Sequence, residues 1–221
     1  MNYALLRRSL RVSLGVGGLL VASTLAAGAQ DTDPLAKLEQ NNRVIIELLI
    51  DSAKTAGLPS QPLLSKALEG IAKKAPSRSI VDAVRKTLGF LRTARSALGG
   101  VDEQELIAAA AVIEAGAKPA HVEQFRPRKK GRTDIEAFIV WADFLRRGVP
   151  GEEASTAITR LWQDGADDET FRSLWSNVQA DISLGLNPGT ALQNRIREAP
   201  GRASPVTVKP PEGQQENQSS R

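Results

Sequence analysis

The sequence has no cysteine and a single histidine, His121, among its 221 residues. The lack of cysteine excludes disulfides and thiolate metal sites, so the fold has to depend on packed apolar surface. One imidazole excludes a cluster of histidine ligands, and no Gly-x-Ser-x-Gly turn is present to hold a serine nucleophile. Glycine-rich phosphate loops of the Rossmann and Walker types are also absent. We therefore expect a protein that uses no metal or cofactor and is not an enzyme.

Long apolar runs are missing too, and the longest uncharged stretch lies near the N-terminus. Arg7, Arg8 and Arg11 precede an uncharged stretch at 12–25. This stretch is shorter than the roughly 20 residues that cross a bilayer, and its basic flank is typical of a secretory signal peptide. Small residues at 27–29 predict cleavage after Ala29. The sequence does not decide between general secretion and twin-arginine export. We expect a periplasmic or secreted protein with no transmembrane segment after cleavage.

An excess of one charge is also lacking once the predicted signal peptide at 1–29 is set aside. The whole chain has 29 Lys+Arg and 25 Asp+Glu, for a formal net charge of +4. Residues 1–29 contain three of the basic residues and no acidic one, and residues 30–199 contain 23 of each kind. Net charge therefore gives no reason to expect a nucleic-acid or membrane-surface partner.

What the sequence does contain is apolar residues at helical spacing between glycine and proline, with no convincing strand. Asp102 with Glu105, and Thr133 with Glu136, have the spacing of a capping box at a helix start. The pattern predicts an all-α fold. The helices are expected at Asp33–Gly57, Ser60–Lys74, Ser77–Leu98, from Asp102, around Pro119–Phe125, from Thr133, at Pro150–Asp164, at Asp167–Leu184 and from Pro188.

The punctuation of these helices recurs along the chain. Gly-Leu-Pro at 57–59, Gly-Val-Asp at 100–102, Gly-Val-Pro at 148–150 and Gly-Leu-Asn-Pro at 185–188 each lead into a helix. We predict an irregular, solenoid-like helix-pair repeat at 30–199, with a period near that of HEAT and armadillo repeats. A compact helical bundle is the alternative. The polar composition of 200–221 predicts a disordered tail.

The densest charged stretch is a basic loop that contains proline and glycine. Its cations are Arg126, Arg128, Lys129, Lys130 and Arg132. A loop of this kind can present several cations to a phosphate, a sulfate or an acidic glycan, which makes it a candidate polyanion-binding site. The alternative is a solvated connection between two helices.

A second candidate is a charged stripe on the helix expected at 60–74. Lys66, Glu69 and Lys73 share one face of this helix, with Gly70 beside them. These residues could form the floor of a groove that a ligand approaches closely at Gly70. The alternative is an ion pair between Glu69 and Lys73 and a glycine that lets two helices pack.

Acidic clusters at 102–105, 152–153 and 167–169 raise the hypothesis of a hydrolase that uses carboxylates alone. Each cluster also lies in the first turn of an expected helix, where carboxylates cap free amides and oppose the helix dipole. The three tryptophans, Trp141, Trp162 and Trp175, are interpreted as core residues, with a glycan or peptide platform as the alternative. The sequence therefore favours a non-enzymatic, exported interaction or scaffold protein that binds a protein or peptide. An acidic-glycan binder that uses the basic loop is the second hypothesis, and the hydrolase is the third.

Overall fold

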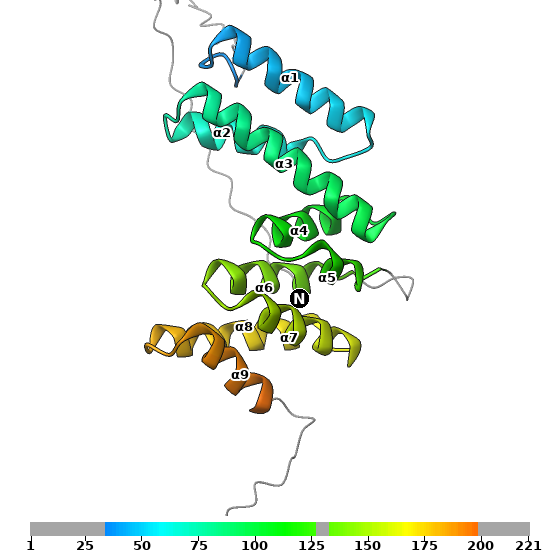
Figure 1. Ribbon diagram of the computed structural model, residues 1–221, viewed down its shortest axis with the longest axis vertical. Helices are drawn as coiled ribbons and strands as arrows, with labels where there is room; N and C mark the ends of the chain where they lie inside the picture. Colours follow the sequence, from blue (N-terminus) through cyan, green and yellow to red (C-terminus); the bar gives the residue numbers. More distant parts are fainter. Residues whose placement is uncertain (1–33, 127–132, 199–221) are drawn as a thin grey trace, which may run out of the picture. The chain divides into compact units, whose positions relative to one another are not determined.

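The protein is all-helical in a computed structural model that describes residues 34–126 and 133–198. Within these residues there are nine helices and no strand (Figure 1), which confirms the predicted fold class. The helices are α1 (Gln40–Thr55), α2 (Gln61–Ala72), α3 (Ser77–Leu98), α4 (Glu103–Glu114), α5 (Pro119–Glu123), α6 (Ile135–Arg146), α7 (Gly151–Gln163), α8 (Asp168–Ser183) and α9 (Pro188–Glu198). The predicted signal peptide and the predicted tail at 200–221 lie outside the described residues.

One apolar core runs through the series of helices. α1 packs on α2 and α3, α3 packs on α4, and α4 packs on α6. α6 contacts α7 and α8, and α9 closes the series against both of these helices (Figure 1). Buried apolar side chains from Leu35 to Leu192 form a single cluster. These contacts establish which helices are neighbours, and the helix-pair repeat stays a prediction.

The longest of the described helices, α3, has the predicted bounds at both ends. Val84 and Leu88 are fully buried on its inner face, four residues apart, as an amphipathic helix requires. Pro76 occupies the N-cap, and Gly99, with φ of 77°, ends the helix. Proline before the first turn and a left-handed glycine after the last turn therefore set the two boundaries of the helix.

Six of the described helices, namely α1, α2, α4, α6, α7 and α8, end in the same turn. In the turn after α4, the N–H of Gly116 donates to the Ile113 carbonyl at 3.0 Å and the N–H of Ala117 donates to the Val112 carbonyl at 3.1 Å. This pair of bonds is the Schellman motif, in which the first of the two donor residues, here Gly116, has a left-handed backbone conformation. Glycine fills that position in five of the six turns, and Lys74 fills it after α2 with φ of 54°.

The first helix begins later than predicted. α1 starts at Gln40 rather than at Asp33–Pro34, and a turn precedes it in which the Leu38 N–H donates to the Leu35 carbonyl at 3.0 Å. Both leucines are buried. Apolar residues three apart pack equally well from a single turn and from a helix, so their spacing did not locate the start.

The start of α6 also differs from the prediction. Asp134 rather than Thr133 is the N-cap, and its side chain makes no capping hydrogen bond. Instead, Asp134 Oδ1 accepts a hydrogen bond from Trp162 Nε1 at 2.6 Å. The Asp134 carboxylate is thus bonded to a residue of α7 and caps no free amide of α6.

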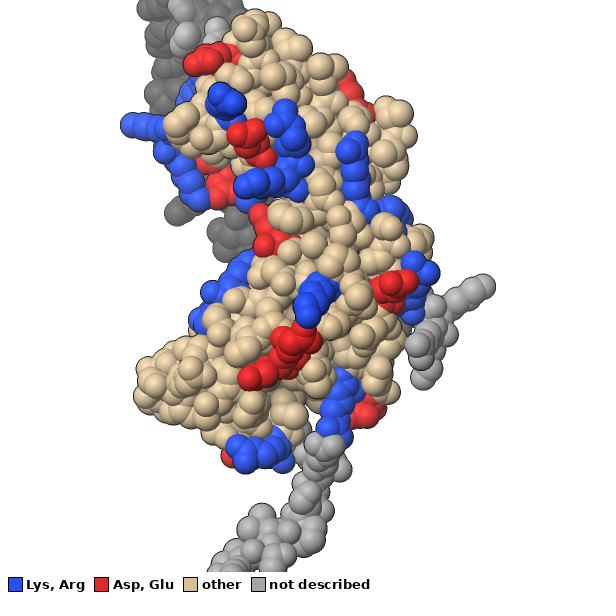
Figure 2. Space-filling view, in the orientation of Figure 1, with Lys and Arg blue, Asp and Glu red and all other residues tan. Residues whose placement is uncertain are grey.

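Charges of both signs are interspersed over the face drawn in Figure 2. The lobe that projects to the left in the lower half of this view, where Figure 1 places the connection between α8 and α9, shows no charged side chain. This connection includes Leu184, which is 81% exposed. Of the helices that the structure describes, none has the length and apolar character needed to cross a membrane.

Replacing Lys74 with glycine is expected to stabilise the protein. A side chain in the left-handed region costs roughly 1–2 kcal/mol, and part of the gain is offset by the greater freedom of glycine in the unfolded chain. We expect the free energy of unfolding to rise by about 0.5–1 kcal/mol in urea titrations followed by circular dichroism. Gly116→Ala, the reverse change in the equivalent turn, is expected to lower it by a similar amount. A loss of stability in Lys74→Gly would contradict this account of the turn.

Candidate functional site

Arg126, the first residue of the basic loop, is engaged with the end of α3. Its Nε donates to the Ala97 carbonyl at 2.7 Å, and its NH2 group donates to the Ser96 carbonyl at 3.1 Å. The guanidinium also lies 3.2 Å from the Glu123 carboxylate. Because the last carbonyls of a helix carry partial negative charge, Arg126 stabilises the C-terminus of α3. The other four residues of the candidate polyanion site, Arg128, Lys129, Lys130 and Arg132, lie outside the described residues, so that hypothesis stays a prediction.

The charged stripe on α2 is a compact ion-pair network. Glu69 accepts hydrogen bonds from Lys66 at 3.1 Å and from Lys73 at 2.5 Å. These bonds hold the pKa of Glu69 below its ordinary value. Burial alone would lower the pKa of Lys66, but the bond to Glu69 and the charge of Glu114 on α4, 3.6 Å away, outweigh it and raise that pKa. The charges of the stripe therefore compensate one another.

A small hollow of about 230 Å³ adjoins this stripe, between α2, α3 and α4. Lys66 and Glu69 line it and Lys73 does not. Gly70 is turned toward α3, where a Cβ would lie 2.7 Å from Ile80 Cγ1. The glycine therefore permits α2 to pack closely on α3, as the packing interpretation predicts, and it does not form the floor of the hollow.

A larger hollow, which we call the α7–α9 groove, has a volume of about 600 Å³. Its lining residues are Glu152, Glu153, Thr156, Ala157 and Arg160 from α7, and Leu192, Gln193, Ile196 and Arg197 from α9. Ala157 and Leu192 are buried and Ile196 is half-buried, so the floor is apolar while the polar residues form the rim. Sequence reasoning singled out Glu152 and Glu153 as an acidic cluster and assigned no site to the other lining residues. The signal available was Leu192 and Ile196, four apart in an otherwise polar helix.

Two contacts hold α9 in place beside α7. At the start of both helices, a Cβ on Gly189 would lie 3.2 Å from Pro150 Cδ and 2.8 Å from Glu153 Oε2. On the other side, Arg195 donates to both carboxylate oxygens of Asp181 on α8, at 2.7 and 2.6 Å. The bidentate bond holds the pKa of Asp181 below its ordinary value. The walls of the groove are thus fixed by close packing at one end and by a charged hydrogen-bond pair behind α9.

The groove has acidic and basic ends. At the start of α7, Glu152 accepts a hydrogen bond from Lys118, which lowers the pKa of this carboxyl, and it lies 3.5 Å from His121 Nε2. At the other end, Arg160 lies 3.7 Å from Asp164. Arg197 donates to uncharged groups of its own helix, the Gln193 carbonyl and the Asn194 amide oxygen. The carboxylates are therefore separated from the guanidiniums along the groove.

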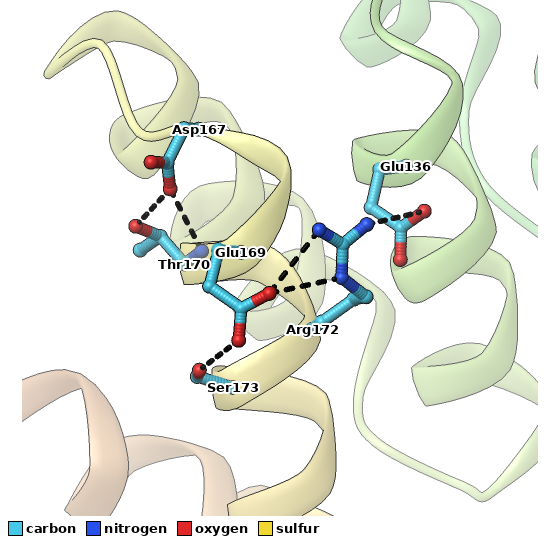
Figure 3. A network of polar contacts seen from close by, with 6 residues as sticks. All are labelled: Glu136, Asp167, Glu169, Thr170, Arg172 and Ser173. Carbon is cyan, nitrogen blue, oxygen red and sulfur yellow. Dashed lines mark hydrogen bonds and ion pairs between the residues drawn. The ribbon is translucent and has the colours of Figure 1, made fainter. Parts of the chain in front are cut away.

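Two of the three acidic clusters predicted at helix starts cap a helix, whereas the cluster at 152–153 lies in the first turn of α7 without a side-chain capping bond. Asp102 accepts from the Glu105 N–H at 2.9 Å, and Asp167 accepts from the Thr170 N–H at 2.9 Å and from its hydroxyl at 2.7 Å. Figure 3 shows the second cap and the ion pair beside it, in which Arg172 links Glu169 of α8 to Glu136 of α6 at 3.6 Å. In the ranges 34–126 and 133–198, no three acidic or histidine side chains are grouped so as to hold a metal ion.

Two buried carboxyls connect α4 to α6. Glu105 is 5% exposed and accepts a hydrogen bond from the Asp134 N–H at 3.2 Å. Asp134 is 6% exposed and accepts from the Trp162 indole. Burial raises the pKa of Glu105, and the charges of Asp134 and Asp102 add to this shift. Glu105 is thus an acid whose ionisation opposes folding.

The three tryptophans are at least half-buried and contribute to the packing of α6, α7 and α8. Trp141 is fully buried in α6, which confirms its predicted place in the core. Trp162 and Trp175 are half-buried, and each donates its indole N–H to a carboxylate, of Asp134 and Asp143 respectively. These bonds join α7 and α8 to α6.

No protein-family model matches this chain, and comparison with curated proteins and with solved structures finds no significant match.

Replacing Glu105 with glutamine is expected to stabilise the protein increasingly as the pH rises. Because the pKa of Glu105 is raised in the folded state, its contribution to stability is full below its unfolded pKa, about 4.3, and is lost as the pH rises through the folded pKa. Glutamine retains an acceptor for the Asp134 N–H without the charge. Urea titrations from pH 4 to pH 7 should therefore show a widening advantage for Glu105→Gln.

The matched control is Glu103→Gln, at an exposed position in the first turn of the same helix. This control should lower the free energy of unfolding by about 0.3–1 kcal/mol at neutral pH, because a negative charge at the helix start interacts favourably with the helix dipole. A Glu105→Gln variant that loses stability relative to the unmodified chain as the pH rises would contradict the assignment.

Proposed function

We propose that this protein is a non-enzymatic interaction module whose α7–α9 groove binds a segment of another polypeptide. The observation that carries the proposal is the groove itself, about 600 Å³ with an apolar floor and a charged rim. Its volume falls within the range of roughly 300–1,000 Å³ that is common for ligand pockets. The groove is built on two helices that are fixed by packing, so it exists before a ligand arrives.

The shape and lining favour a polypeptide over a small polar ligand. Ala157, Leu192 and Ile196 offer apolar contact along two helices rather than a few convergent polar groups. This lining suits an amphipathic helix, which buries apolar side chains spaced one turn apart and leaves its polar face in water. A helix laid there would continue the packing by which each described helix covers its neighbours.

The carboxylates of the chain support a non-enzymatic role. A hydrolase that uses carboxylates alone needs one acid that stays protonated near neutral pH beside one that is ionised. Glu152 in the groove has a lowered pKa because Lys118 bonds to it, so it is ionised at neutral pH. Glu105 has a raised pKa and lies beside Asp134, but both are buried, at 5% and 6% exposed, and are bonded within the fold between α4, α6 and α7. Asp102 and Asp167 are occupied as helix caps.

We also propose that the interaction takes place outside the cytoplasm. The support is the sequence at 1–29, where three arginines precede an uncharged stretch and small residues end at Ala29. In this setting the partner is a periplasmic or secreted protein.

Selection of peptides from a random phage-displayed library on the purified protein tests the proposal. We expect amphipathic peptides to be enriched and to lose about tenfold or more in affinity toward Ile196→Asn, which removes apolar surface from the groove floor. Leu184→Asn is the matched control, since this leucine is exposed in the α8–α9 connection and does not line the groove. Thermal unfolding confirms that both variants fold.

Failure to enrich any peptide above background would refute the proposed function. Equal losses in Ile196→Asn and Leu184→Asn would place binding elsewhere on the protein. Fluorescence polarisation with the enriched peptides gives the affinities for this comparison.

A further inference from the structure

The α7–α9 groove has a defined direction. Both walls begin at the contact between Pro150 and Gly189, where Glu153 Oε2 closes the space between the helices. At a rise of about 1.5 Å per residue, Arg160 lies about 15 Å along α7 from Pro150, and Arg197 lies about 12 Å along α9 from Gly189. The two guanidiniums therefore flank the same end of the groove, away from the closed end.

These two arginines have less charge compensation than their neighbours. Arg195 on the same helix binds both oxygens of Asp181 and also bonds to Glu198 at 3.0 Å. Arg197 has only uncharged acceptors among the described residues, and Arg160 is 3.7 Å from Asp164, near the outer limit of an ion pair. An incoming carboxylate at this end would gain two cations without having to break a strong pair.

On α7 the apolar floor lies about one helical turn before the arginine, and on α9 it extends up to the residue next to the arginine. On α7, Ala157 precedes Arg160 by three residues, and on α9, Leu192 precedes Arg197 by five with Ile196 between them. A helix in the groove that places an apolar side chain on this floor therefore brings the residue three or four positions away beside the guanidiniums. We take the separation of Ala157 and Arg160, three residues on α7, as the spacing expected of the partner.

We propose that the α7–α9 groove binds an amphipathic helix of another polypeptide that carries an apolar residue and, three or four positions away, an aspartate or glutamate. The apolar side chain lies on Ala157, Leu192 and Ile196, and the carboxylate accepts hydrogen bonds from Arg160 and Arg197. The inference depends on the proposed function, since it names the partner of the same groove. It adds the charge of the partner, the spacing of the partner's apolar and acidic residues, and the residues of this protein that recognise them.

The test uses amidated synthetic copies of the enriched peptides, each made with its acidic residue and with the corresponding amide, Gln or Asn. Amidation removes the terminal carboxylate as a competing source of negative charge. We expect the acidic form to bind about tenfold or more tightly, because hydrogen bonds between charged groups are stronger than those to a neutral amide. The preference should weaken as salt is raised.

Variants of the two arginines test which residues bind the carboxylate of the peptide. In the double variant Arg160→Gln with Arg197→Gln, the preference for the acidic form should fall to about one. In Arg160→Glu with Arg197→Glu, selection should yield peptides with Lys or Arg in the same place. Arg146→Gln, which removes an exposed cation of α6 outside the groove, is the matched control and should keep the preference. The ratio between two peptides on one variant is independent of modest changes in stability.

A chain that ends at Glu198 tests a competing occupant, the segment 199–221 that follows α9. We expect this chain to bind the acidic peptides as the full chain does. If affinity rises tenfold or more on removal of the segment, the chain's own C-terminal segment is the occupant and the proposal is wrong.

The remaining outcomes separate this proposal from the one on which it depends. Enriched peptides that bind the groove equally in acidic and amide forms overturn the carboxylate assignment and leave the proposed function standing. Peptides that bind only with a free terminal carboxylate also overturn it. If no peptide is enriched, both proposals fail.

Discussion

Each helix of this protein depends on its neighbours to keep its apolar face out of water. With no cysteine in the sequence, no covalent bond between side chains shares that task, and the buried residues form one cluster from Leu35 to Leu192. Burial of apolar surface contributes about 25 cal/mol per Å², so stability accumulates across the interfaces rather than within any one helix. The polar bonds between helices, such as Trp162 to Asp134 and Arg195 to Asp181, then set how the neighbours are placed.

The shared helix-ending turn explains how a chain of short helices keeps reversing onto itself. Its two hydrogen bonds occupy carbonyls that a helix end would otherwise leave free, and its left-handed residue redirects the backbone. The residue after that position is apolar in all six turns, and Leu58, Ala117 and Val149 are buried there. Leu186 is the exception, at 37% exposed, in the turn that leads into α9. The last of these turns is therefore the one whose apolar residue is least covered.

The fold was predictable where local signals mark both ends of a helix, and the groove was not predictable at all. Pro76 and Gly99 bound α3 as expected. α1 begins later than predicted because Leu35 and Leu38 lie in a separate turn, and the N-cap of α6 is Asp134 rather than Thr133, with its carboxylate bonded to Trp162. The α7–α9 groove depends on which helices meet, through the approach of Gly189 to Pro150. This contact joins segments about forty residues apart, and no motif in either segment predicts it. The acidic residues at 152–153 were correctly placed in a first helical turn, yet that position does not reveal that they also border a groove.

Among the described residues, exposed large apolar side chains gather on the first helix of the series and beside the last. Six large apolar residues are exposed among those that the structure describes, and Ile139 is the one in the middle of the series. Val44, Ile45 and Leu48 lie on the outer face of α1, and Leu184 and Leu186 lie beside α9. Stacked helices that stay solitary in solution carry polar outer faces at both ends. In the described part of this chain, Val44, Ile45, Leu48, Leu184 and Leu186 keep apolar surface exposed at these two ends, where burial of that surface would be favourable.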